Sequence, residues 1–191
     1  MGKWLKQTLA ALLCLAGCTA TLRPSGEIKH WAVYYDAELP AKTFKPYDLV
    51  VFDRRYHPPL EPLKGKTTTL AYVSIGELQQ DTKEEKSLQK QGIILQKNPE
   101  WGSYVVDITA PRWKNIVLEQ VADASARGFD GVMLDTVESP LHWAQTEAPH
   151  RTNAFAEAAI GLVEEIRAKH PDMKIMLNRG FDVLPEVSNQ I

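Results

Sequence analysis

Six short apolar runs recur along the 191-residue chain, and they constrain its fold more than any other feature. Each run is rich in β-branched and aromatic residues. Each is apolar almost throughout, which is typical of parallel strands buried on both faces. Helical patterns and loops separate the runs, so the sequence predicts a parallel α/β fold. The runs are Trp31–Asp36, Asp48–Asp53, Thr69–Glu77, Ser103–Asp107, Gly131–Asp135 and Lys174–Arg179.

Three segments between the runs have the character of helices. Pro111–Arg127 carries an apolar stripe, with Thr109 as a candidate N-cap and Gly128 as the stop signal. Thr152–Lys169 carries a second stripe, and Asp81–Gln91 is a polar, charge-rich candidate. The residues expected to face inward are Ile116, Val117, Val121 and Ala124 in the first helix, and Phe155, Ala159, Leu162, Val163 and Ile166 in the second.

Six strands fit either an open doubly wound sheet or part of an eight-stranded (β/α)8 barrel. No GxGxxG or GxxxxGK[ST] phosphate loop follows any run, which disfavours a nucleotide-binding sheet. A complete barrel typically needs about 250 residues. We therefore favour an incomplete TIM-like barrel of about six strands, in which the proline-rich connection 54–66 is irregular.

Acidic residues close five of the runs. In parallel barrels the active site lies at the C-terminal ends of the strands, so these carboxylates are expected to meet at one mouth. Cleavage of a glycosidic bond uses two carboxyl groups, one to protonate the leaving oxygen and one to attack or stabilise the sugar. The alternative is that each acid caps a helix or ties a turn, and Asp107 fits that role best. The five acids are Asp36, Asp53, Glu77, Asp107 and Asp135.

The N-terminus has the features of an export signal. Lys3 and Lys6 precede an apolar stretch, and the following Leu15-Ala16-Gly17-Cys18 resembles the lipobox of bacterial lipoproteins. That resemblance implies cleavage before Cys18 and attachment of lipid to its sulfur; the alternative is a core helix with an incidental cysteine. The expected organisation is a signal peptide (1–17), a lipid-anchored tether (18–29) and a barrel domain (30–191).

Composition narrows the range of partners. Removing Lys3 and Lys6 with the signal peptide leaves 20 basic and 24 acidic residues, a formal charge of −4, which disfavours nucleic acid. Cys18 would then be the only cysteine, so no disulfide framework is expected. None of the five histidines has HExxH spacing, and we expect no metal and no cofactor. We expect a monomer in the cell envelope, at the outer membrane or cell surface rather than the inner membrane, because Thr19 is not an aspartate-type retention signal.

Three segments resemble glycoside hydrolase family 114, the endo-α-1,4-polygalactosaminidase-like proteins. They are Leu70–Glu77 (LAYVSIGE), Gly128–Thr136 (GFDGVMLDT) and Leu177–Phe181 (LNRGF), and GFDGVMLDT is the most specific. The resemblance runs from about Trp31 to the end of the chain. It implies a barrel hydrolase that cleaves α-1,4-linked galactosamine-containing polysaccharide.

The same resemblance implies roles for individual residues. Asp135, in the LDT triplet, corresponds to a catalytic carboxylate. The second is a glutamate on a strand after LNRGF, and the chain ends at Ile191 before that position, so we expect a C-terminally truncated form. Glu138 stands where the family usually has aspartate. The residues expected to contact substrate are Glu77, Glu138, Asp53, Asn178, Arg179 and Tyr34.

Several of these roles have structural alternatives. Asn178 and Arg179 suit sugar hydroxyls or the orientation of a carboxylate, although Arg179 also fits a structural ion pair. Tyr34 and Tyr35 are adjacent in a strand and must point to opposite faces, so at most one faces the barrel interior. For the whole chain, the alternatives to a glycosidase are a non-catalytic polysaccharide-binding lipoprotein or inactive fragment, and an open α/β sheet that binds a small molecule.

Overall fold

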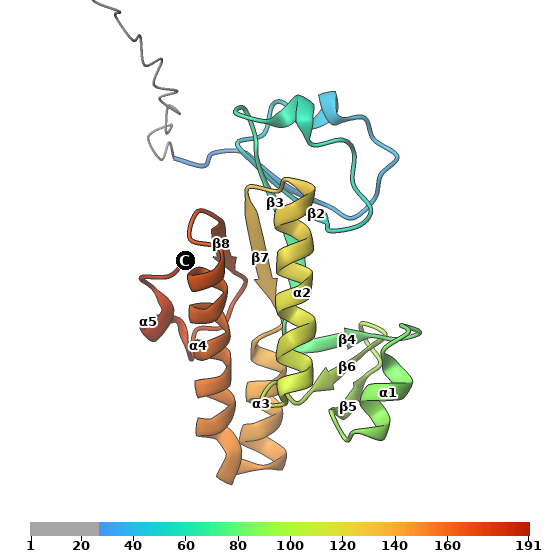
Figure 1. Ribbon diagram of the computed structural model, residues 1–191, viewed down its shortest axis with the longest axis vertical. Helices are drawn as coiled ribbons and strands as arrows, with labels where there is room; N and C mark the ends of the chain where they lie inside the picture. The colour runs from blue at the N-terminus through green and yellow to red at the C-terminus, as the bar shows by residue number, and fades with distance from the viewer. Residues whose placement is uncertain (1–26) are drawn as a thin grey trace, which may run out of the picture.

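A five-stranded parallel sheet forms the centre of the computed structural model, which describes residues 27–191. The strand order is β1-β2-β3-β7-β8, and every neighbouring pair is parallel (Figure 1). All five C-terminal ends therefore reach the same edge, as the apolar runs predicted. The strands are β1 (Trp31–Tyr34), β2 (Leu49–Asp53), β3 (Thr68–Ser74), β7 (Gly131–Asp135) and β8 (Lys174–Leu177).

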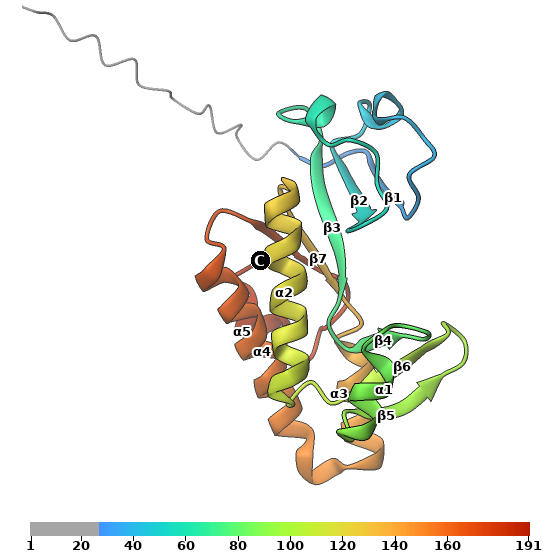
Figure 2. The same cartoon turned by 45° about the vertical axis from the view of Figure 1, so that its right-hand side comes forward.

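A second, antiparallel sheet is inserted between β3 and α2. It consists of β4 (Glu77–Gln79), β6 (Ser103–Val106) and β5 (Ile94–Asn98), with the short helix α1 (Glu85–Lys90) in the same insertion. Figure 2 shows these elements beside the C-terminal end of β3, outside the parallel sheet.

This insertion corrects two expectations. The run that ends at Asp107 is not a strand of the parallel sheet: β6 pairs antiparallel with β4 and β5. Its apolar residues Val105 and Val106 are buried, and Val106 belongs to the main core. The run from Thr69 to Glu77 is not one strand, because the chain turns at Gly76. A Cβ on that glycine would lie 2.0 Å from the Thr136 carbonyl oxygen, so the turn is pressed against the end of β7.

The two long helices have the predicted bounds. They are α2 (Pro111–Arg127) and α4 (Thr152–Lys169), and both predicted apolar stripes are buried. Gly128 ends α2 in the left-handed conformation, at φ 87°. The predicted cap at Thr109 is wrong: Ala110 is the N-cap, and the Thr109 hydroxyl donates to the Asp107 carboxylate instead.

Other elements depart from the prediction or were not expected. The predicted polar helix at 81–91 is shorter in the structure, where α1 covers only Glu85–Lys90. Helix α3 (Glu138–Glu147) was not expected, and its narrow buried face consists of Pro140, Leu141 and Ala144. The connections after β1 and β2 contain only the 3-10 turns η1 (Ala41–Phe44) and η2 (Glu61–Leu63), in line with the predicted irregular loop. A third 3-10 turn, η3 (Pro149–Arg151), precedes α4, and α5 (Leu184–Val187) follows β8.

The two faces of the parallel sheet are covered unequally. The outer face packs against α2 and α4 through a large cluster that includes Phe52, Trp113 and Phe155. The inner face has a small cluster of Leu49, Val51, Leu70 and Met133. β1 and β8 each pair with one neighbour, so the barrel is not closed. Within residues 27–191, no helix is both long and apolar enough to cross a membrane.

Candidate active site

Three neighbouring strands converge on the carboxylate of Asp135. Asp135 is the last residue of β7 and lies opposite Ser74 of β3. The Asn178 side-chain amide donates a hydrogen bond of 2.7 Å to Asp135 Oδ1, and the Asn178 backbone N–H is fixed by the Leu134 carbonyl. The Tyr72 phenol, from β3, also hydrogen-bonds to Asp135. The carboxylate is thereby oriented from both sides.

Two tyrosines flank this carboxylate. The rings of Tyr35 and Tyr72 meet edge to face, with centroids 5.1 Å apart. Burial raises the pKa of Tyr72 far above its usual value of 10, and the negative charge of Asp135 and the hydrogen bond to it raise the pKa further. Partial burial raises the pKa of Tyr35 to about 12, with contributions from the Asp135 and Asp53 carboxylates. Both phenols are therefore neutral donors near neutral pH.

Hydrogen bonds join the SIGE segment (74–77) to the LDT segment (134–136) at the end of β7. The Ile75 N–H donates to the Asp135 carbonyl at 2.9 Å, and the Gly76 N–H donates to Thr136 Oγ1 at 3.0 Å. The hydroxyls of Ser74 and Thr136 are 2.8 Å apart, and the Trp113 indole N–H donates to the Ile75 carbonyl at 2.7 Å. The two motifs thus form one braced turn that fixes the end of β7.

Glu138 and Arg179 form an ion pair beside the Asn178–Asp135 contact. Arg179 Nη1 lies 3.2 Å from Glu138 Oε1, and 68% of the arginine side chain is exposed, so the pair is a weak surface interaction. The other oxygen, Glu138 Oε2, is buried and has no hydrogen-bond partner among the described residues. This oxygen is enclosed by the protein, so a ligand reaches it only when the Glu138 side chain moves.

Glu77 lies in the interior, where its carboxylate is used by the protein itself. The residue is 7% exposed, and its two oxygens accept three side-chain hydrogen bonds. These bonds join the antiparallel sheet to α3, so the geometry gives Glu77 a structural role in place of the expected substrate contact. The donors are Asn98, Ser103 and Ser139.

Asp53 ends β2 on the same side of the sheet as Tyr72, its partner in register. Its Oδ1 accepts hydrogen bonds from the backbone N–H groups of Arg55 (2.7 Å) and Tyr56 (2.8 Å). Asp53 therefore closes the turn after β2 and also contributes negative charge near Tyr35.

The expectation that Tyr34 contacts substrate is corrected. Tyr34 pairs in register with Phe52, and its ring packs against Phe44 and Phe52 on the outer face. The inner position belongs to Tyr35. Alternation along β2, where Phe52 is outer and Asp53 is inner, identifies the inner tyrosine only once the register between β1 and β2 is known.

Two of the five strand-end acids do not join this site. The Asp107 carboxylate pairs with Arg151 at 2.7 Å and holds Thr109, which is the structural role weighed for it. Asp36 is exposed and accepts a hydrogen bond from the next backbone N–H. Cys18, the expected lipidation site, lies outside the described residues. Within residues 27–191, no group of three or more His, Cys, Asp or Glu residues is arranged to hold a metal ion.

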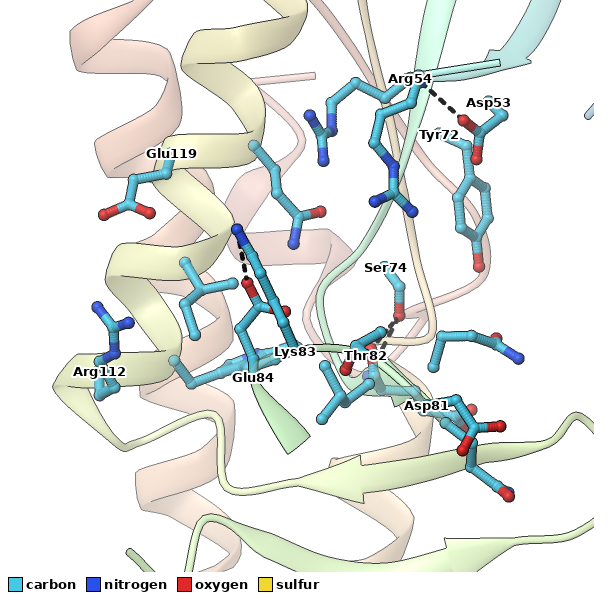
Figure 3. A pocket seen from close by; sticks show the side chains of 18 residues that line it. Asp53, Arg54, Tyr72, Ser74, Asp81, Thr82, Lys83, Glu84, Arg112 and Glu119 are labelled. Atoms are coloured by element: carbon cyan, nitrogen blue, oxygen red, sulfur yellow. Dashed lines mark hydrogen bonds and ion pairs between the residues drawn. The ribbon is translucent and has the colours of Figure 1, made fainter. Parts of the chain in front are cut away.

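A cavity of about 850 Å³ opens beside this site. Figure 3 shows Tyr72 and Asp53 on one side of it and Arg112 and Glu119 of α2 on the other. The cavity therefore runs from the C-terminal ends of β2 and β3 to the flank of the sheet.

Known proteins with sequences and structures similar to this chain support the same fold. The glycoside hydrolase domain of PelA from Pseudomonas aeruginosa matches with a TM-score of 0.73 and 29% identity, covering 84% of this chain and 63% of that one. Ega3 from Aspergillus fumigatus, solved in complex with galactosamine, matches with a TM-score of 0.68 and 17% identity, covering 91% of this chain and 68% of that one; this likeness concerns the fold alone. These matches confirm the incomplete TIM-like barrel.

Curated relatives extend beyond the matched region. An uncharacterised protein of Thermotoga maritima is 29% identical over 122 residues, which are 60% of this chain and 38% of that protein. One from Deinococcus radiodurans is 29% identical over 175 residues, which are 82% of this chain and 55% of that protein. The chain thus spans about half or less of their length. The model of glycoside-hydrolase family GH114 matches residues 15–191, and the chain belongs to this family.

Proposed function

We propose that this chain is a glycoside hydrolase that cleaves α-1,4-linked galactosamine-containing polysaccharide and uses Asp135 as a catalytic carboxylate. The observation that carries the proposal is the fixed position of Asp135 at the C-terminal edge of the sheet, between Asn178 and Tyr72. Active sites of parallel barrels lie at that edge. Membership of GH114 and the likeness to the PelA hydrolase domain support the same reaction class.

The surroundings of Asp135 hold its carboxylate in one orientation. The Asn178 amide donates a hydrogen bond of 2.7 Å to it from one side, and the Tyr72 phenol donates from the other. An ionised carboxylate can attack the anomeric carbon or stabilise the positive charge that develops there. The resemblance places the second catalytic carboxyl group, a glutamate, on a strand after LNRGF.

The charge at the mouth suits an amino sugar. The Glu138 and Asp53 carboxylates lie with Asp135 around the C-terminal edge, so a protonated amine there would face anionic groups. We assign Glu138 to the amine and Asn178 and Arg179 to sugar hydroxyls.

The direct test is the substitution Asp135→Asn, assayed by cleavage of partially deacetylated galactosaminogalactan. We expect a loss of at least about a hundredfold in kcat, because an amide can neither attack nor carry the charge. The matched control is Asp36→Asn, which also alters an acid that follows a strand but whose only described contact is local. Cleavage by Asp135→Asn at the unsubstituted rate would refute the assignment.

Binding without cleavage is the second candidate function. This function is favoured because the carboxylates of Glu77 and Asp53 already accept hydrogen bonds from the protein, so neither serves as the second catalytic group. In that case the polysaccharide would retard the protein in a native gel, but incubation of the two would release no reducing ends from the polysaccharide. Asp135→Asn would then leave the retardation intact.

We also propose that Cys18 anchors the protein, as a monomer, to the outer membrane or the cell surface. The proposal is supported by the Leu15-Ala16-Gly17-Cys18 sequence after a positively charged start. Labelling with radioactive palmitate should mark the unsubstituted protein and should leave Cys18→Ser unlabelled. Equal labelling of both would refute it, and membrane fractionation would show which membrane holds the protein.

A further inference from the structure

The cavity beside the active site exists because no long helix covers this flank of the sheet. In the described chain, the connection from β2 to β3 contains only the 3-10 turn η2, so the space next to α2 is left open. The Arg54 guanidinium reaches across to the Asp123 carboxylate on α2, and this ion pair ties the loop after β2 to the helix. The Arg54–Asp123 ion pair therefore holds one wall of the cavity in place.

The lining is polar and nearly balanced in charge. Four basic and five acidic side chains line the cavity, so neither an anion nor a cation is strongly favoured. The side chains of Arg112 and Glu119 on α2 are exposed, and neither side chain makes a hydrogen bond or ion pair with any residue between 27 and 191. The far end of the cavity therefore offers one unused donor group and one unused acceptor group.

An unsatisfied hydroxyl points to a ligand. Thr82 Oγ1 is buried in the cavity wall and has no hydrogen-bond partner among the described residues. A buried polar atom without a partner is unfavourable, so a ligand that bonds to this hydroxyl after the threonine side chain rotates recovers that loss. Figure 3 shows Thr82 between the α2 residues and Tyr72, along the path from the flank to the mouth.

We propose that this cavity is a remote binding site for polysaccharide, which holds uncharged sugar units of the same chain whose scissile bond lies at Asp135. The proposal rests on the proposed function. Sugar hydroxyls both donate and accept hydrogen bonds, as Arg112, Glu119 and Thr82 together require. The volume of about 850 Å³ is within the range of small-ligand sites and exceeds what one sugar unit fills. Tyr72 joins the two sites, because it lines the cavity and bonds to Asp135.

The test compares a long polymer with a short oligosaccharide that fills only the mouth, using the full chain. The variant Arg112→Ala/Glu119→Ala removes one charge of each sign from exposed positions on α2. The matched control is Lys86→Ala/Glu157→Ala, which does the same on α1 and α4 outside the cavity. We expect the first variant to lose about tenfold in kcat/KM on the polymer, mainly through KM, because it loses hydrogen bonds to the sugar. Its kcat/KM on the oligosaccharide should equal that of the control.

The outcomes separate this proposal from the proposed function. If the variant and the control cleave the polymer equally well, the remote site is refuted and the hydrolase remains. If the unsubstituted chain cleaves neither substrate, the proposed function is refuted. In that case, retardation by the polymer in a native gel tests whether the cavity binds polysaccharide. Loss of retardation in Arg112→Ala/Glu119→Ala, but not in the unsubstituted chain or the control, supports the remote site. Any other pattern refutes it.

Discussion

At the scale of single residues, strand alternation decides which side chains share the mouth. Tyr35, Asp53, Tyr72 and Asp135 follow the inner face, while Tyr34 follows the outer one. The sequence could show that Tyr34 and Tyr35 point in opposite directions, but not which of them points inward. That choice depends on the register with β2, which is fixed by packing between strands far apart in the chain.

Replacing Asn178 by aspartate should change the pH dependence of cleavage. The substitution puts a second carboxylate at the position where an amide now donates to Asp135 at 2.7 Å. Two adjacent carboxylates resist simultaneous ionisation, so the acidic limb of the kcat/KM profile should move upward by about one pH unit. The control is Asn178→Ala, which removes the donor without adding charge and should lower the rate with a smaller shift. An unchanged acidic limb in Asn178→Asp would contradict the role given to this contact.

Ionisation of Tyr35 should lower stability in alkali. Its pKa is raised from 10 to about 12 in the folded protein, so the unfolded chain releases this proton first. The contribution of the protonated Tyr35 phenol to the unfolding free energy is therefore complete below pH 10 and is lost as the pH rises from 10 to about 12. Urea unfolding across this interval should show a steeper loss for the unsubstituted protein than for Tyr35→Phe. Parallel curves for the two proteins would contradict the raised pKa.

At the scale of elements, sequence signals that act over a few residues predicted the two long helices correctly. The bounds of α2 and α4 follow from their apolar stripes and from Pro111 and Gly128, which act within a few residues. β6 was misassigned because an apolar run does not record which sheet it joins. Its antiparallel partners β4 and β5 are chosen by tertiary packing. The buried role of Glu77 could not be predicted for the same reason, because its three hydrogen-bond partners come from separate elements that only the tertiary fold brings together.

The turn between β3 and β4, which is braced against the end of β7, should not tolerate a side chain at Gly76. A Cβ there would lie 2.0 Å from the Thr136 carbonyl oxygen, so Gly76→Ala must displace the turn that holds Asp135. We expect a loss of about 1–3 kcal/mol in unfolding free energy together with a marked loss of cleavage. The control is Gly161→Ala in α4, where a Cβ meets nothing within 4 Å and should stabilise by about 0.5–1 kcal/mol. Gly76→Ala with unchanged stability and rate would show that the turn adapts.

At the scale of the whole molecule, the covering of the sheet is one-sided. The outer face has the packed helices, and α/β proteins of this class bury both faces of a parallel sheet. Near-continuous apolar runs predicted that both faces would be buried, which is why the sequence indicated a parallel α/β fold. On the inner face, Leu49, Val51 and Leu70 are buried, but in the edge strand Trp31 is 63% exposed and Val33 is 41% exposed.

This exposed inner edge should bind an apolar dye. In register, Trp31 lies opposite Leu49 and Val33 opposite Val51, so both side chains extend the inner apolar cluster toward the edge of the sheet. Contiguous apolar surface of this kind attracts anilinonaphthalene sulfonate. The variant Trp31→Ser/Val33→Thr should lower the fluorescence of the bound dye by at least about half, because it removes the largest exposed part of the patch. Phe181→Ser removes a ring that is 76% exposed and follows β8, so it serves as the control and should leave most of the signal. A signal lost in Phe181→Ser and retained in the double variant would place the dye at the rim of the active site, and the inner edge would then be covered in solution.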